Sequence, residues 1–276
     1  MADGGNASAS FFLIALRMQW CDDVQPSMTQ YASKTATLDR ASPLEVRECE
    51  GAAETLGVTI IDLDRTLTRR GTYSPFLVYA ASRRAPWRLV FIPAVLACML
   101  GYRLGWMSRK ALKQRMHRML LGAAVPQALV ERLAEGFATR VMTTNLNPGA
   151  RDLVAREQSE GRRVILATAA HRFYAEAIAD RLGIDRVVAT ESVWRAGRLT
   201  PELLGENCYG ADKATAVQRY LRTTGWDRST ISLRCYSDDV SDLPCFEACD
   251  EAIAVNPSAA LERRGAARGW PVLRLR

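Results

Sequence analysis

Aspartates that follow two apolar runs are the residues of this sequence best suited to chemistry. Asp62 and Asp64 stand at the end of the apolar run 58–63. In an extended segment, side chains two residues apart point to the same side, so both carboxylates can face one pocket. One carboxylate can attack phosphorus and form an aspartyl-phosphate, while the other transfers protons. A solvated turn or a helix cap would explain the same pair without any catalysis.

A second group of acids follows the run 231–236. It contains Asp238, Asp239 and Asp242. So many carboxylates in one cleft would repel each other unless a cation bound among them. Mg²⁺ prefers a few carboxylates together with waters and phosphate oxygens. The sequence therefore predicts a Mg²⁺ site that includes these acids.

Two further positions can bind a phosphoryl group. The run 163–168 ends in Thr168, and we expect Ala169, Ala170 and His171 to open a helix, where a hydroxyl and backbone N–H groups would form a phosphate cradle. Lys213 follows Gly210 at the start of another expected helix and can neutralise phosphoryl oxygens. Each residue also has a structural explanation, as a helix cap or as a solvated lysine.

Apolar runs and helical segments alternate in the part of the chain that holds these residues. The expected strands are 58–63, 163–168, 231–236 and 252–255, and the expected helices are 150–160, 172–182, 213–222 and 258–267. This alternation predicts an α/β fold with a Rossmann-like parallel sheet covered on both faces. Since ligands bind at the carboxyl edge of such sheets, the residues named above should meet there.

The stretch 72–145 breaks this alternation. It predicts four helices and no convincing strand, with the helices at 73–84, 86–104, 108–121 and 126–142. We therefore expect a helical-bundle cap inserted after the first strand. The predicted domains are a mobile N-terminal extension (1–54), a catalytic core (55–71 and 147–276) and the cap (72–146).

The ordered motifs resemble those of the haloacid dehalogenase (HAD) superfamily. They are DLDRTLT, ILATAAH, Lys213 and YSDDVSDLP, and the resemblance runs from about Val58 to the C-terminus. It implies that Asp62 is the nucleophile and Asp64 the general acid/base. An acid two residues after the nucleophile favours phosphoryl transfer over dehalogenation. The remaining implied roles are Mg²⁺ binding by Asp62, the Asp64 carbonyl and Asp238, phosphoryl binding by Thr168 and Lys213, and orientation of the metal's waters by Asp242.

The insertion and the C-terminal tail are similar to the phosphoserine-phosphatase-like branch, subfamily IB. Two features depart from that pattern. Arg65 replaces the glycine usual after the second aspartate, and no acid follows the first motif before Glu131. Phosphoserine phosphatases carry an acid there that receives the substrate's ammonium group. This difference counts against free phosphoserine as the substrate, although a small soluble phosphate ester remains the alternative.

Charge is segregated along the chain. Residues 65–130 hold ten Arg, two Lys and no acid, a net charge of +12, whereas the other 210 residues sum to −5. This segregation predicts an anionic partner. No recognisable nucleic-acid-binding motif accompanies it, so nucleic acid is not expected. The segment also resembles the insert of phosphatidylglycerophosphate phosphatases, which favours a multiply anionic or lipid phosphate as substrate.

One apolar segment of the cap has two interpretations. Residues 89–102 carry no charge and lie between Trp87 and Trp106. A helix of this length spans about 21 Å, short of the roughly 30 Å hydrocarbon core. The segment is then either a buried cap helix or an interfacial helix on an anionic membrane. A non-catalytic membrane-binding module on a HAD scaffold is the competing functional class.

The cysteines bear on the cellular compartment. Seven are present, an odd number, without a CxxC pair. This pattern argues against a disulfide framework and for a reducing compartment. We therefore expect a cytoplasmic location, with peripheral contact at the inner face of the membrane as an extension of it. The sequence predicts neither the particular substrate nor the oligomeric state.

Overall fold

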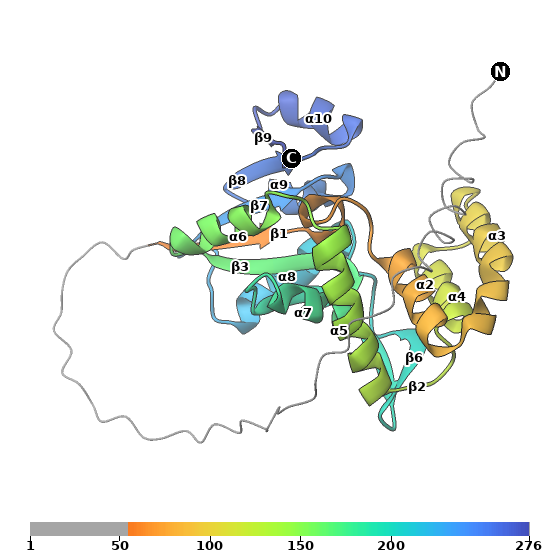
Figure 1. The fold of residues 1–276 in the computed structure, drawn as a ribbon. Coiled ribbons are helices and arrows are strands. Elements are labelled where there is room, and N and C mark those ends of the chain that lie inside the picture. Colours follow the sequence, from red (N-terminus) through yellow and green to blue (C-terminus); the bar gives the residue numbers. More distant parts are fainter. Residues whose placement is uncertain (1–54, 276) are drawn as a thin grey trace, which may run out of the picture. The chain divides into compact units, whose positions relative to one another are not determined.

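A six-stranded parallel sheet forms the centre of the protein in the computed structural model, which describes residues 55–275 (Figure 1). The expected extension over residues 1–54 lies outside the described residues. In sheet order the strands are β4 (Arg186–Thr190), β3 (Arg163–His171), β1 (Leu56–Ile61), β7 (Ile231–Ser237), β8 (Glu251–Val255) and β9 (Val272–Leu273). All neighbouring strands run parallel. The predicted α/β fold with a Rossmann-like sheet is confirmed.

Helices cover both faces of this sheet. They are α6 (Ala150–Ser159), α7 (Arg172–Asp180), α8 (Ala211–Thr223), α9 (Leu243–Glu247) and α10 (Ala259–Ala266), together with the short 3₁₀ helix η3 (Val240–Asp242). Alternate residues of the strands enter two separate apolar clusters. Ile61 and Leu166 pack with α6 and α7, whereas Ile60 and Ile165 pack with α8. Burial on both sides explains why these strands read as continuous apolar runs.

The helical insertion follows β1 and lies beyond the carboxyl ends of the strands (Figure 1). A helical turn, η1 (Leu63–Leu67), leads from β1 into it. Its elements are α2 (Tyr73–Arg84), the 3₁₀ helix η2 (Pro86–Phe91), α3 (Ile92–Arg103), α4 (Arg109–Leu120), β2 (Val125–Pro126) and α5 (Gln127–Thr144). We refer to residues 72–146 as the cap. Its placement leaves the carboxyl edge of the sheet between core and cap.

The expected second cap helix, 86–104, differs from the structure in two ways. It is divided into η2 and α3, with Pro93 in the first turn of α3. Proline suits a first helical turn because its missing N–H is not needed there. The interpretation as a buried helix is also wrong: η2 buries no residue, and α3 buries only Val95 and Gly101. Within residues 55–275, no helix is both long and apolar enough to cross a membrane.

A small antiparallel sheet was not expected from the sequence. Its strands are β2, β6 (Arg198–Leu203) and β5 (Ser192–Arg195), so a cap residue pair joins a hairpin of the core. The expectation of no strand in the cap is therefore wrong at residues 125–126. Ala196 and Gly197 form the hairpin turn, both with positive φ. A two-residue turn of this kind favours Asn-Gly, and Ala-Gly is a weak signal for it.

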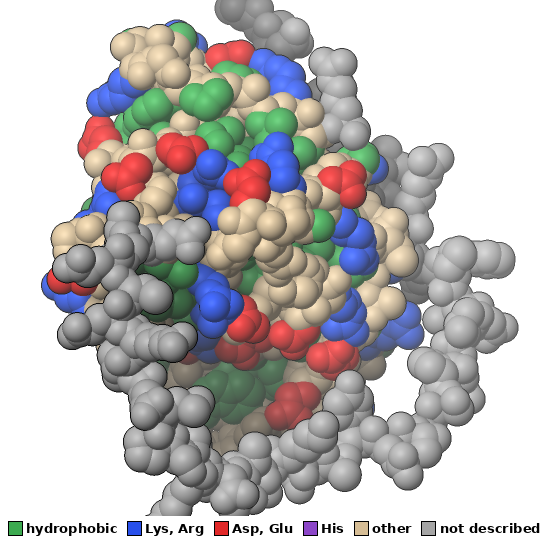
Figure 2. All heavy atoms as spheres, turned by 90° about the vertical axis from the view of Figure 1, so that its left-hand side faces the viewer, with side chains coloured by type: hydrophobic (Ala, Val, Ile, Leu, Met, Phe, Trp, Pro, Cys, Tyr) green, Lys and Arg blue, Asp and Glu red, His purple; other side chains and the backbone are tan. Residues whose placement is uncertain are grey.

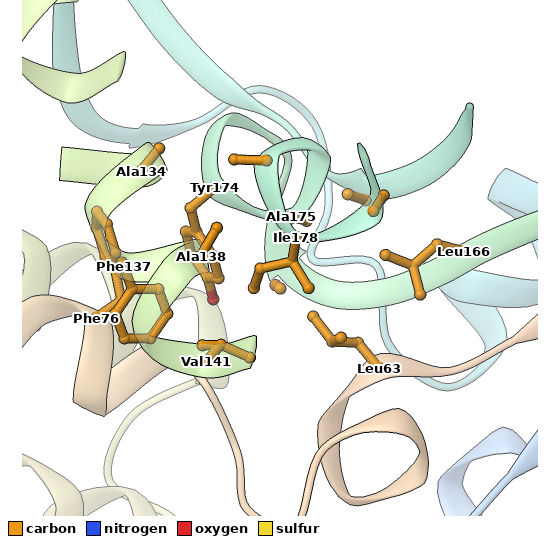
Figure 3. Packing of buried hydrophobic residues seen from close by; sticks show 14 of the residues in the cluster. Leu63, Phe76, Ala134, Phe137, Ala138, Val141, Leu166, Tyr174, Ala175 and Ile178 are labelled. Carbon is orange, nitrogen blue, oxygen red and sulfur yellow. The ribbon is translucent and has the colours of Figure 1, made fainter. Parts of the chain in front are cut away.

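Aromatic side chains join the cap to the core. Phe76 of α2 stacks on Tyr174 of α7, with ring centroids 4.6 Å apart. Phe137 of α5 meets both rings edge-on, at 5.3 Å and 5.8 Å. Figure 3 shows these three rings packed together, next to Ile178 and Val141. The apolar core thus continues from the sheet into α2 and α5 and fixes the inner side of the cap.

Removing one of these rings should destabilise the whole domain. We expect Phe76→Ala to lower the free energy of unfolding by about 4 kcal/mol, because a fully buried ring leaves a cavity. Phe91→Ala is the matched control, since Phe91 is 36% exposed and should cost less than about 1 kcal/mol. Urea unfolding followed by circular dichroism measures both. Equal losses in the two variants would contradict this account of the cap–core contact.

Candidate active site

Asp62 follows the last residue of β1, the central strand of three that end at the site. Its backbone N–H donates to the Tyr236 carbonyl of β7 at 2.9 Å, and its side chain is buried. Lys213, in the first turn of α8, contacts the Asp62 carboxylate. Its Nζ donates to Asp62 Oδ1 at 2.8 Å and to Asp242 Oδ2 at 2.7 Å. The structure therefore brings together three residues that are up to 180 positions apart in the sequence.

Asp242 is held between Lys213 and the end of β7. Its Oδ2 also accepts a hydrogen bond from Ser237 Oγ at 2.6 Å. The other oxygen, Oδ1, is buried and has no hydrogen-bond partner among the described residues. A buried carboxylate oxygen without a donor is costly unless something positive or a water reaches it. Ser237 carries no signal in the sequence beyond its place at a strand end.

Asp238 lies beside Asp62 at the ends of neighbouring strands. In the parallel register Ile61 is opposite Tyr236, so Asp62 comes one residue after this pair and Asp238 comes two residues after it. Burial, together with repulsion from Asp239, raises the pKa of Asp238 to about 7. Burial likewise raises the pKa of Asp62 to about 8, although Lys213 acts in the opposite direction. The site thus holds more buried negative charge than its lysine alone can compensate.

Asp64 lies in the turn that follows Asp62. Arg65 has a φ of 68°, which lets the chain reverse direction directly after Asp64. The Asp64 Oδ1 atom accepts hydrogen bonds from the Thr72 backbone N–H at 2.9 Å and from Thr72 Oγ1 at 2.8 Å. Burial raises the pKa of Asp64, and these two bonds oppose that rise. Thr72 was not identified from the sequence, which gives no local sign of its contact with Asp64.

Thr168 lies within the third strand of the site, β3, and is fully buried. The expectation that Ala169, Ala170 and His171 open a helix is wrong, since β3 continues to His171 and α7 begins at Arg172. The extension has a cause in β4: Thr190 pairs with His171 and donates from Oγ1 to the Ala169 carbonyl at 2.8 Å. Thr168 Oγ1 accepts from the Ala170 N–H at 3.0 Å.

A buried lysine of the cap also reaches this region and was missed in the sequence. Lys113 of α4 donates from Nζ to the Ala169 carbonyl and to Asn207 Oδ1, both at 2.5 Å. Its ammonium also lies 5.2 Å from the centre of the Tyr73 ring. Burial lowers the pKa of Lys113 to about 7, and the Asp64 charge opposes this shift. Its position next to Leu112, in the apolar stripe of α4, was the available signal.

The donor set of the site fits Mg²⁺. No group of three His, Cys, Asp or Glu side chains within residues 55–275 is arranged to hold a metal. The predicted site needs only two side-chain carboxylates, from Asp62 and Asp238, with the backbone carbonyl of Asp64. Mg²⁺ usually keeps several waters and takes few protein ligands. The excess of buried carboxylates and the unpartnered Asp242 Oδ1 are the features of this structure that suit a cation.

Comparison with known proteins identifies the family and several relatives of this chain. A family model described as haloacid dehalogenase-like hydrolase matches residues 59–247. A probable phosphatase of Mycobacterium tuberculosis is 30% identical over 161 residues, which are 58% of this chain and 55% of that protein. A phosphoserine phosphatase of the same organism is 31% identical over 140 residues, 51% of this chain and 45% of the relative. The chain spans about half the length of these curated relatives.

A solved structure matches over a larger part of the chain. It is the crystal structure of a protein of unknown function from Bordetella pertussis Tohama I. The TM-score is 0.74 at 27% sequence identity, and the match covers 80% of this chain and 100% of the other. The similarity thus extends over core and cap together rather than over the sheet alone.

The pKa of Lys113 leads to a test by pH. Above about pH 7 the folded protein loses a proton that the unfolded chain keeps until about pH 10, so stability rises with pH in this window. Lys113→Met removes this titration. We expect the stability difference, wild type minus Lys113→Met, to increase by about 2 kcal/mol from about pH 7 to about pH 9. Urea unfolding at both pH values measures it, with Lys110→Met as the control that shows no such change.

Proposed function

The chain belongs to the haloacid dehalogenase-like hydrolases, and we propose that it is a phosphomonoester hydrolase with Asp62 as its nucleophile. One observation carries this proposal: Lys213 fixes Asp62 Oδ1 by a hydrogen bond of 2.8 Å. Within residues 55–275 no hydrogen bond holds the other oxygen, Oδ2. A carboxylate with one oxygen fixed and one available is oriented for attack on phosphorus.

The proposed reaction has two steps. Asp62 Oδ2 attacks phosphorus and forms an aspartyl-phosphate, while the P–O bond to the leaving group breaks and Asp64 gives that oxygen a proton. Asp64 then takes a proton from the water that attacks the aspartyl-phosphate, so that phosphate leaves and Asp62 is regenerated. Because Thr72 occupies Asp64 Oδ1, the proton is carried by Oδ2.

Other groups of the site bind rather than react. Thr168, the backbone N–H of Ala169 and Lys213 would bind the phosphoryl oxygens, and Asp242 would orient the metal's waters. Asp62, the Asp64 carbonyl and Asp238 would hold Mg²⁺. When bound, Mg²⁺ supplies positive charge that stabilises the phosphoryl group during transfer. These assignments are supported by the buried contacts of Lys213 and Asp242 described above.

The surroundings of the site favour a leaving group that carries further negative charge. Arg65, Arg69 and Arg70 follow the catalytic turn and are exposed. Arg65 is close enough to Asp238 to oppose part of the rise in the pKa of that acid. Below about pH 7, Lys113 adds a buried positive group from the cap. We therefore propose a multiply anionic or lipid phosphate as the substrate, with phosphatidylglycerophosphate as an example of that chemistry.

A small phosphate ester such as phosphoserine is the second candidate. Its support is the similarity to a phosphoserine phosphatase of Mycobacterium tuberculosis. Against it stands the absence of any Asp or Glu between residues 65 and 130, since the substrate's ammonium group would have no acid from this segment to bind. A panel of substrates that includes both compounds separates the two candidates.

We further propose the division into a catalytic core, 55–71 with 147–276, and a cap, 72–146. The course of the chain supports it, because β1 and β3 are neighbours in the sheet although the whole insertion separates them. The five cysteines between residues 55 and 275 are all free. This supports a reducing, cytoplasmic location as part of the proposal.

Replacing the nucleophile should abolish turnover. We expect Asp62→Asn to lower kcat for p-nitrophenyl phosphate by at least about 10³, because the neutral amide cannot form the acyl-phosphate. Removal of divalent metal by chelation should abolish wild-type activity, and Mg²⁺ should restore it. Asp212→Asn is the control, since Asp212 is an exposed acid next to Lys213 and should keep full activity. A wild type without Mg²⁺-dependent hydrolysis of any phosphomonoester tested would refute the proposal.

Below about pH 7, where Lys113 is charged, this charge should affect substrates unequally. We expect Lys113→Met to lower kcat/KM for phosphatidylglycerophosphate about tenfold more than for p-nitrophenyl phosphate. Only phosphatidylglycerophosphate carries a second anionic group, and the variant would no longer attract that group. Lys110→Met removes the same charge from the same helix, where the lysine pairs with Glu206 at 2.9 Å. If both variants changed kcat/KM for the two substrates by the same factor, Lys113 would have no role in recognising the leaving group.

A further inference from the structure

The outer side of the cap exposes an unusual amount of apolar surface. Ten large hydrophobic side chains are exposed among the described residues, and seven of them lie between Trp87 and Trp106. Trp106 is 79% exposed and Trp87 is 62% exposed. We call the exposed apolar side chains of residues 87–106 the α3 surface. Apolar patches of this kind on a folded domain mark places where something else binds.

The packing of α3 leaves this surface without a partner in the described part of the chain. From Ile92 to Met99 the helix has no polar side chain, so it is apolar all round. Such a helix is normally buried on every side. Here α3 packs on α4 and η2, and Leu96, Leu100 and Leu104, one turn apart along one side, remain exposed. The fold of residues 55–275 therefore does not account for this side of the helix.

Positive charge borders the α3 surface at both ends. Arg88 lies over the Trp87 ring at 4.8 Å and donates to the Arg118 carbonyl at 3.1 Å, so Arg88 and Arg118 are next to Trp87. Arg103 closes α3 near Trp106. Arg103 and Arg118 are exposed and form no ion pair with a described residue. No acid occurs from residue 65 to residue 130 to balance them.

The other side of the molecule has a different character. On the face shown in Figure 2, basic and acidic side chains are interspersed. A surface of mixed sign does not attract anions over a distance. A negatively charged partner should therefore be attracted to the cap and not to the far end of the sheet.

We propose that the α3 surface docks on an anionic lipid bilayer. Twelve residues of α3 extend about 18 Å, too little to cross the hydrocarbon core, so the helix would lie along the interface. Tryptophans at its two ends suit headgroup depth, and the arginines beside them meet lipid phosphates. Leu96, Leu100 and Leu104 enter the acyl region. A protein partner would require acids among its apolar residues, whereas an anionic bilayer presents both features everywhere.

The docking does not depend on the proposed hydrolase function. The α3 surface lies on the side of the cap that faces away from the carboxyl ends of the strands (Figure 1), and none of its residues belongs to the proposed catalytic machinery. The two proposals can therefore fail separately.

Vesicle sedimentation of the full chain tests the docking. We expect binding to vesicles of phosphatidylcholine with phosphatidylglycerol, weaker binding at high salt, and little binding to phosphatidylcholine alone. Leu100→Glu should lower the partition coefficient at least about tenfold, because it places a like charge and a polar group in the acyl region. Leu204→Glu is the matched control, since Leu204 is as exposed as Leu100 but lies outside the cap, and it should bind within about twofold of wild type.

Two further measurements make the result decisive. Both glutamate variants should keep wild-type turnover of p-nitrophenyl phosphate, which shows that they fold, and Asp62→Asn should bind vesicles like wild type. A wild type that stays in the supernatant with anionic vesicles overturns the proposal, as does equal weakening by Leu204→Glu. Sedimentation velocity identifies the other occupant: a dimer that Leu100→Glu dissociates, without vesicle binding, would assign the α3 surface to a second copy of the chain.

Discussion

Lys213 contacts two buried carboxylates at once, and the other groups of the site are arranged around this contact. Burial disfavours its ammonium, but Asp62 and Asp242 raise the pKa of Lys213 well above its usual value. Removing one partner of such a buried set leaves an uncompensated charge, which costs several kcal/mol. The parallel sheet makes the contact possible because β1, β3 and β7 end at the same edge. One lysine cannot neutralise Asp62, Asp64, Asp238 and Asp242, so the same edge suits a divalent cation.

The cap is held to this edge by apolar packing and adds charge to it. Phe76 and Phe137 anchor α2 and α5 on Tyr174, close to the Thr72 hydroxyl that binds Asp64. Tyr174 and Thr72 are themselves 3.3 Å apart between their hydroxyl oxygens. Cap position and the orientation of the proposed acid/base are therefore mechanically linked. A displacement of α2 would disturb Asp64 without touching Asp62, since Thr72 directly precedes that helix.

The acids that are proposed to react could be named from the sequence because they follow strands, which apolar runs reveal locally. Thr168 was found from the apolar run that it ends, and Lys213 from its place at the start of an expected helix. Lys113 and Asn207 were not, since their contact joins positions 94 residues apart and has no local pattern. The β5–β6 hairpin was missed because Ala196 adopts a φ that alanine rarely takes. The exposure of α3 could not be predicted from the sequence either. An apolar run predicts burial, and only the packing of α3 on α4 and η2 shows which side of α3 lacks a partner.

Basic side chains of the cap lie on two different sides of it, and α4 carries basic residues on both its buried and its exposed side. Lys113 and His117 lie one turn apart on its buried side, whereas Arg115 and Arg118 are exposed on the other side. At about 100° per residue, positions two and five residues after Lys113 cannot share its face. Lys113 lies close enough to the site for the Asp64 charge to oppose the fall in its pKa, whereas Arg118 borders the α3 surface next to Arg88. One helix therefore carries both sets of basic residues, but the residue that lies near the site and those that are exposed on the outer side are distinct.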